Sequence, residues 1–150
     1  MTNPIAPKPA PFHFGALLHI KGDGLDLDDI SRTLGLAPTS ISQKGERYGH
    51  AQTLCDYDAW DYYSPVDKER PLDEHIMALW DAVRPHIGYL HGLKQKFEVS
   101  VSLHVNSGSF WFGKEHHTSF ELDHRCMGLF SELGIPFKVF VTIAERVKEK

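Results

Sequence analysis

Residues 97–105 read FEVSVSLHV, and this short stretch decides the fold class. Apolar side chains occupy its odd-numbered positions and polar side chains occupy the even-numbered ones. Because successive side chains of a strand point to opposite faces of a sheet, the alternation predicts a strand with one buried face and one solvated face. This two-sided character is typical of antiparallel sheets, since parallel sheets are covered on both faces. Residues 106–108 have turn chemistry and predict a hairpin that returns through residues 110–112.

Other stretches of the chain also have the composition of strands. Residues 12–20 and 137–143 alternate in the same way, which predicts the first and last strands of the sheet. Residues 58–64 carry a tryptophan and two tyrosines, types that favour a pleated surface. Residues 41–49 are polar and interrupted by glycine, and they predict a strand with a loop.

Apolar residues at helical spacing predict helices over residues 26–34, 71–83 and 118–133. The first has an aspartate at the N-cap position and a glycine just after its last residue. The second begins at a proline and should break or kink at Pro85. The third begins with the spacing of a capping box.

Together these elements predict a single α+β domain, an antiparallel sheet with helices packed mainly on one face. Similar helix endings at residues 34–38 and 133–136 are compatible with a pseudo-duplicated, ferredoxin-like arrangement. Residues 1–11 contain four prolines and predict a flexible tail. Residues 12–143 form the domain, and residues 144–150 form a charged C-terminal end.

Composition limits the function classes. A chain of 150 residues can bury a core without disulfide staples. Its net charge of −4 gives no electrostatic basis for binding nucleic acid or an anionic membrane. Cys55 and Cys126 lie far apart, and the N-terminus lacks the features of a secretory signal, so we expect free thiols and a cytoplasmic location.

The order of several short motifs resembles the bacterial family known as domain of unknown function 4279. The motifs are LHIKGDGLDLDDISRTLG at 18–35, KGE at 44–46, the Trp60 strand, LDEHIMALWDAVRP at 72–85 and SFELDHRCMGLFSELGI at 119–135. The resemblance covers residues 12–143. It implies no assigned catalytic residue, and the toxin–immunity gene neighbourhoods of some relatives imply a protein-binding role.

The segment CDYDAWDYYSPVD at 55–67 interleaves aromatic rings with carboxylates and contains no basic residue. Rings that anchor and carboxylates that steer suit a surface that captures a basic protein. The candidate binding residues are Asp58, Trp60, Asp61, Tyr62 and Tyr63. The alternative is an ordinary strand whose rings pack inward while its aspartates face water.

Histidines provide a second set of candidates. His13, His19 and His104 fall on the polar faces of predicted strands, where they could form a ligand site or supply a general base. His117, His124 and Cys126 have metal-ligating side chains, but their spacing matches no structural zinc pattern. We therefore predict no metal, no cofactor and no catalytic residue.

The sequence thus predicts a non-catalytic, immunity-like module that binds a basic protein such as a toxin. The alternative is a small-ligand-binding protein or enzyme that uses the polar sheet face around His19 and His104.

Overall fold

The alternating stretch forms β6 (Glu98–Ser107), which pairs antiparallel with β1 (His13–Gly22) at the centre of a sheet. The computed structural model of the protein describes residues 13–107 and 121–143. In β6 the apolar residues of the alternation are buried, with Val101 and Leu103 at most 1% exposed. The predicted buried apolar face is therefore confirmed. The predicted solvated face is not, because Ser100 and Ser102 on the polar side are only 1% and 9% exposed.

The sheet has five strands in the order β2-β5-β1-β6-β7, and β3 pairs with β4 as a separate two-stranded ribbon. The pairs within the sheet are antiparallel except for β6 and β7, which run parallel. The remaining elements are α1 (Leu27–Leu34), β2 (Ser40–Ser42), β3 (Arg47–Tyr48), β4 (Thr53–Leu54), β5 (Asp58–Tyr63), α2 (Leu72–Val83), the 3₁₀ turn η1 (Arg84–His86), α3 (Ile87–Lys94), the 3₁₀ turn η2 (His124–Cys126), α4 (Met127–Leu133) and β7 (Phe137–Ile143).

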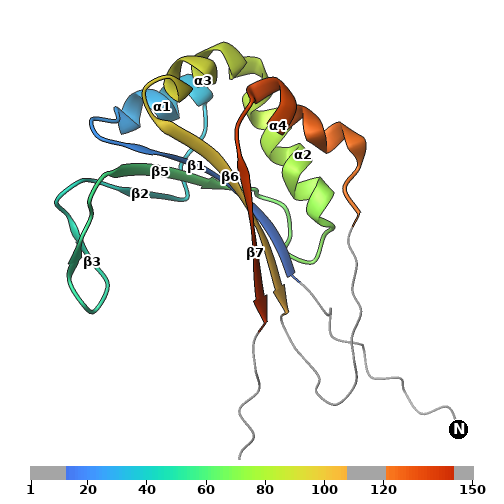
Figure 1. Cartoon of the computed structure of the whole chain (residues 1–150), viewed down its shortest axis with the longest axis horizontal. Coiled ribbons are helices and arrows are strands. Elements are labelled where there is room, and N and C mark those ends of the chain that lie inside the picture. The colour runs from blue at the N-terminus through green and yellow to red at the C-terminus, as the bar shows by residue number, and fades with distance from the viewer. Residues whose placement is uncertain (1–12, 108–120, 144–150) are drawn as a thin grey trace, which may run out of the picture.

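The helices cover one face of the sheet, and the β3–β4 ribbon projects on the opposite side (Figure 1). This arrangement confirms the prediction of an α+β fold with helices on one face. A single apolar core fills the space between the two layers. Its fully buried members include Leu18, Ile20 and Leu103 from the sheet and Ile76, Leu79 and Leu129 from the helices. No helix in the described ranges is long and apolar enough to cross a lipid bilayer.

Four predicted helix boundaries are confirmed. The Asp26 side chain accepts a hydrogen bond from the backbone N–H of Asp29 at 3.0 Å, which caps the first turn of α1. Gly35 ends this helix with φ of 67°, and Gly134 ends α4 with φ of 64°. Pro85 separates α2 from α3 through η1, the expected break.

The start of the third predicted helix is wrong. Glu121 lies outside any helix, and its supposed capping partner Thr118 lies outside the described residues. The helical segment begins instead at η2, where the Asp123 carboxylate accepts a hydrogen bond from the backbone N–H of Arg125 at 2.9 Å. Cys126, a member of the predicted apolar stripe, follows Asp123 by three residues. The cap at Asp123 therefore sets where the helical segment starts.

The predicted hairpin return through residues 110–112 also lies outside the described residues, as do the predicted tail and the C-terminal end. The neighbours of β6 are β1 and β7. Read along the chain, β1, α1, β2, β5, α2 and β6 follow the β-α-β-β-α-β order of ferredoxin-like folds, and α4 and β7 come after them. Helix α1 belongs to this order, whereas α4 comes after it. The two similar helix endings therefore do not both lie within the ferredoxin-like part of the chain.

A buried histidine lies where β5 leads into α2. His75 is 1% exposed, and its Nδ1 lies 2.6 Å from the Ser64 hydroxyl. Its Nε2 is buried and has no hydrogen-bond partner among the described residues. Burial lowers the pKa of His75 below its ordinary value of 6.5, and the backbone of Arg70 and Asp67 offsets only part of this effect. Burial in the folded protein therefore favours the neutral form of this ring.

A pH titration of stability tests this reading. With a lowered pKa, the unfolded chain binds more protons than the folded one, so the free energy of unfolding should fall as the pH drops below about 6.5. We expect His75→Asn, which keeps a polar atom near the Nδ1 position, to flatten this fall in urea unfolding measured between neutral and mildly acidic pH. A variant with an unchanged slope would contradict the assignment.

Candidate functional site

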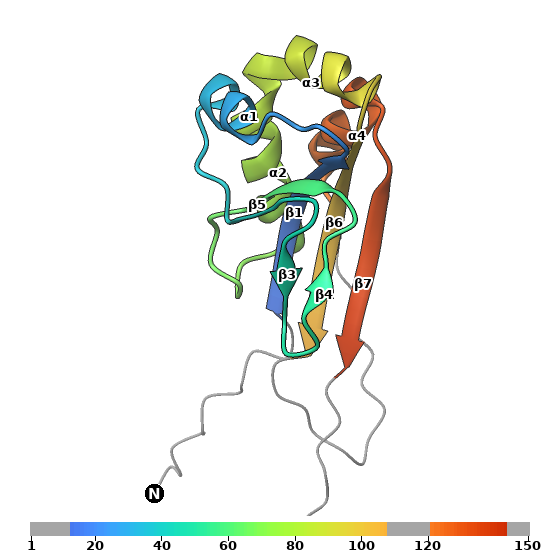
Figure 2. The ribbon, with the colours of Figure 1, turned by 90° about the vertical axis from the view of Figure 1, so that its left-hand side faces the viewer.

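A groove of 450 Å³ lies on the helix-free side of the sheet, between the sheet surface and the β3–β4 ribbon. Figure 2 shows this ribbon in front of β1 and β6, on the side away from the helices. The floor of the groove comes from β1, β2 and β5, and its outer wall comes from the ribbon. Segments with up to four elements between them in sequence therefore enclose one space.

The floor is formed by a histidine and a carboxylate from neighbouring strands. His19 of β1 and Asp61 of β5 are register partners, and His19 Nδ1 contacts Asp61 Oδ1. The Ser40 hydroxyl donates to the other carboxylate oxygen at 3.3 Å. A carboxylate that holds Nδ1 fixes the ring and leaves Nε2 to face a ligand, which is the arrangement that orients a general base. The structure thus joins one residue from each of the two predicted sets.

The rim of the groove is apolar and exposed. Four of the ten large apolar side chains that are more than two-fifths exposed in the described part line this groove: Ile41, Tyr48, Leu54 and Tyr57. Tyr48 and Leu54 are 59% and 49% exposed and come from opposite strands of the ribbon. Exposed apolar side chains that gather around a groove with polar neighbours are typical of binding sites.

Charge around the groove is mostly negative. Glu46, Asp56 and Asp61 contribute carboxylates to the lining, whereas Arg47 contributes the one guanidinium. The Arg47 side chain donates to the backbone carbonyl of Gln52 at 3.2 Å, within the ribbon. The rings and carboxylates together favour a cationic partner over an anionic one.

Asp58 anchors the ribbon to the domain. Its carboxylate accepts hydrogen bonds from the backbone N–H groups of Gly24 and Leu25, at 3.0 and 3.1 Å, and of Lys44, at 2.8 Å. The bond from Lys44 contributes most to lowering the pKa of Asp58. Because residue 44 lies just before the ribbon, this carboxylate fixes where the ribbon leaves the sheet.

The alternation of β5 divides the predicted binding residues between two faces. Trp60 is fully buried, and its Nε1 donates to the Ser31 hydroxyl of α1 at 2.9 Å. Tyr62 packs against the same core. Asp61 faces the groove, and Tyr63 is 42% exposed on the same helix-free face. Trp60 therefore supports the sheet from inside, and only part of the acidic-aromatic segment is available to a partner.

The three predicted histidines lie along the helix-free face without forming one cluster. His13 and His19 are six residues apart on β1, which separates them by roughly 20 Å. The ring of His104 is stacked on Phe140 with centroids 5.5 Å apart, and burial lowers its pKa. Of the three, His19 alone lines the groove.

Sequence reasoning missed the ribbon residues Tyr48 and Leu54. The available signal was the pair of glycines at 45 and 49, both of which adopt positive φ at turns. Cys126, which the sequence analysis considered as a metal ligand, is buried, and its Sγ lies 3.5 Å from the carbonyl oxygen of Asp73. Its supposed partner His117 lies outside the described residues, within which no group of three or more metal-ligating side chains occurs.

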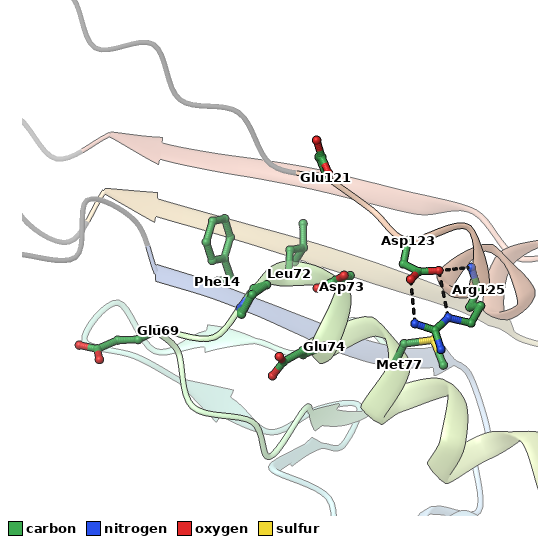
Figure 3. A pocket seen from close by; sticks show the side chains of 10 residues that line it. Phe14, Glu69, Leu72, Asp73, Glu74, Met77, Glu121, Asp123 and Arg125 are labelled. Atoms are coloured by element: carbon green, nitrogen blue, oxygen red, sulfur yellow. Dashed lines mark hydrogen bonds and ion pairs between the residues drawn. The ribbon is translucent and has the colours of Figure 1, made fainter.

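A larger cavity of 590 Å³ opens on the helix-bearing side at the start of α2 (Figure 3). Ion pairs occupy several of its charges: Arg125 binds Asp123 at 2.8 Å, and Arg70 binds Glu74 at 2.6 Å. These partners lower the pKa of both carboxyl groups. None of the predicted binding residues lines this cavity, so we place the candidate site in the groove under the ribbon.

Comparison with known proteins gave one match. A family model described as a domain of unknown function (DUF4279) matches residues 11–143, which is most of the chain. No curated protein and no solved structure is significantly similar to the chain.

The anchoring role of Asp58 predicts a local loss of order. In Asp58→Asn one oxygen must serve the three backbone donors, and the new amide group opposes them. We expect a lower melting temperature and faster hydrogen exchange at the amides of Lys44 and Gly24. Asp56→Asn, an exposed neighbour in the groove, is the matched control and should leave both measurements unchanged. Equal exchange in the two variants would remove Asp58 from this role.

Proposed function

Since this chain belongs to the DUF4279 family, whose description names no activity, we propose its function from the groove itself: the protein is a non-catalytic module that binds a basic protein between the sheet and the β3–β4 ribbon. The observation that supports this most is the set of four exposed apolar side chains around an acidic groove. Exposed rings provide buried contact area when a partner covers them. The carboxylates raise the rate of encounter with a cationic surface.

The groove suits one protruding segment of a partner. Tyr48 and Leu54 of the ribbon and Ile41 of β2 are among the residues that line the groove, so an inserted side chain would meet apolar groups there. Lys21 Nζ lies 4.9 Å from the centroid of Tyr57, which illustrates that this ring accepts a cation. A lysine or arginine flanked by apolar residues would match both features.

An immunity-like role is the most concrete form of this proposal. Toxins that act on nucleic acid need basic clefts to hold phosphates, and an acidic-aromatic surface can occlude such a cleft. A cytoplasmic location accords with this role, and it is supported by the unpaired state of Cys55 and Cys126.

The histidine–carboxylate pair favours a second candidate function. His19 held by Asp61 at the floor of a cavity is suited to binding a small ligand or to general-base catalysis. A thermal-shift screen separates the two candidates. A ligand whose stabilising effect disappears in His19→Asn but persists in Tyr48→Ser would favour the small-ligand function.

The protein-binding function predicts a specific capture pattern in the native cells. A photoreactive amino acid at Tyr48 should form a covalent adduct with a basic protein, whereas the same group at Met127, which is 42% exposed on α4, should not. With the captured protein purified, we expect Tyr48→Ser to weaken binding by more than about 1 kcal/mol. Replacing Glu46 and Asp56 by their amides should mainly slow association, most clearly at low salt.

The immunity-like form adds a growth measurement. The captured protein alone should arrest growth, and co-expression with the parent chain, but not with Tyr48→Ser, should restore it. Equal capture at positions 48 and 127, or association that is insensitive to the amide changes, would place the function elsewhere.

A further inference from the structure

The second group of exposed apolar side chains lies on the edge strand β7. Phe137, Val139, Phe140 and Val141 are 46%, 46%, 47% and 58% exposed. Together with the groove residues they account for eight of the ten large apolar side chains that are more than two-fifths exposed in the described part. They belong to one strand and to both faces of it, so they form a patch separate from the groove.

Among the described residues, no strand pairs with the outer edge of β7. Strand β7 is hydrogen-bonded to β6 on one side, and the described sheet ends there, as Figures 1 and 2 show. An edge strand presents a row of N–H and C=O groups that pair readily with another strand. Natural edges are protected by charge, proline or short length, but in β7 Lys138 is the one charged residue among seven.

We propose that β7 pairs antiparallel with β7 of a second copy of this chain, about a two-fold axis that passes midway between the two copies of Phe140. Residue 140 is the midpoint of the seven-residue strand, so this register pairs every position of one copy with a position of the other. The axis is perpendicular to the sheet, which places the helices of both copies on the same side. The product is one continuous sheet that joins the two domains.

The side chains of β7 are self-complementary in this register. Val139 opposes Val141 of the other copy on the helix-bearing side, where both are exposed in one chain alone. On the helix-free side Phe140 opposes its own copy, and Lys138 opposes Thr142 rather than another lysine. Apolar pairs directly across strands stabilise a sheet and opposed like charges destabilise it, so this pattern specifies a second copy.

The neighbouring strand holds Phe140 in place for this contact. The ring of Phe140 stacks on His104 of β6 with centroids 5.5 Å apart, and Tyr63 of β5 lies 5.8 Å beyond His104. A two-fold axis between the two copies of Phe140 extends this row of rings from one copy into the next. The rings add aromatic contact to the main-chain hydrogen bonds of the shared sheet.

The opposite edge of the sheet limits the assembly to two copies. There β2 is only three residues long, Ser40–Ser42, and two of these are serines. An interface that uses the same strand from both copies is isologous and closes on itself. The sheet therefore grows once, at β7, and stops.

The test begins with the oligomeric state of the full chain. Sedimentation equilibrium of the parent protein should give twice the mass of 17.0 kDa. Phe140→Lys places two ammonium groups opposite each other and should raise the dimer Kd by at least about tenfold. Leu54→Lys is the matched control, because Leu54 is 49% exposed and lies on the ribbon, and its Kd should equal that of the parent.

Cysteine crosslinking checks the register without a disruptive charge. In a Cys55→Ser background, Phe140→Cys should oxidise to a covalent dimer, since directly opposed strand residues lie within disulfide range. Leu54→Cys should stay monomeric under the same conditions. Val141→Lys, at the most exposed of these four apolar positions of β7, serves as the second charge variant if Phe140→Lys fails to fold.

Several outcomes would overturn the proposal. A parent protein that is monomeric at every concentration would mean that β7 is covered by its own chain or kept for a different protein. A dimer that Leu54→Lys disrupts and Phe140→Lys leaves intact would place the interface at the groove. Crosslinking through position 54 in preference to position 140 would lead to the same conclusion.

Discussion

The antiparallel pairing of β1 with β6 is the constraint on which the rest of the structure depends. Nine residue pairs align the two strands, so Ile20 and Val99 point to the helices while His19 and Ser100 point away from them. Burial of one side stabilises the fold, since each buried aliphatic side chain contributes about 1.5–3 kcal/mol. Because all four described α-helices lie on that side, no helix covers the other face, and the groove forms there beneath the two-stranded β3–β4 ribbon, whose strands are two residues long.

The division of labour within β5 follows from the same geometry. Trp60 and Asp61 are adjacent in sequence and point to opposite faces, one bonded to α1 and the other to β1. Strand β5 thus separates the core on one side from the groove on the other. Residues that looked like one acidic-aromatic surface in the sequence serve two purposes, because a period of two separates them.

The central strands were predictable, because their apolar pattern repeats over many residues and one face is fully buried. The ends of α1 were predictable for a different reason, since an aspartate cap and a left-handed glycine act locally. The start of the helical segment before α4 was not, because its cap at Asp123 competes with an equally plausible spacing upstream.

The candidate site was half predictable: His19 and Asp61 appeared in separate sets, and only strand order, which depends on long-range contacts, brings them together. The ribbon has no buried face, so its sequence lacks the alternation of apolar residues that would have predicted Tyr48 and Leu54 as strand residues.

The three hydrogen bonds to Asp58 keep the attachment of the ribbon independent of the sequence of the ribbon itself. They hold the base of the ribbon against the start of α1 and the end of β1, and none of them involves the ribbon strands or the turn between them. Residues 47–54 are all exposed, so substitutions and changes of length there alter the groove without removing core contacts. Such changes can therefore reshape the groove while the folding of the domain is left unchanged, in the way that variable loops diversify on a constant scaffold.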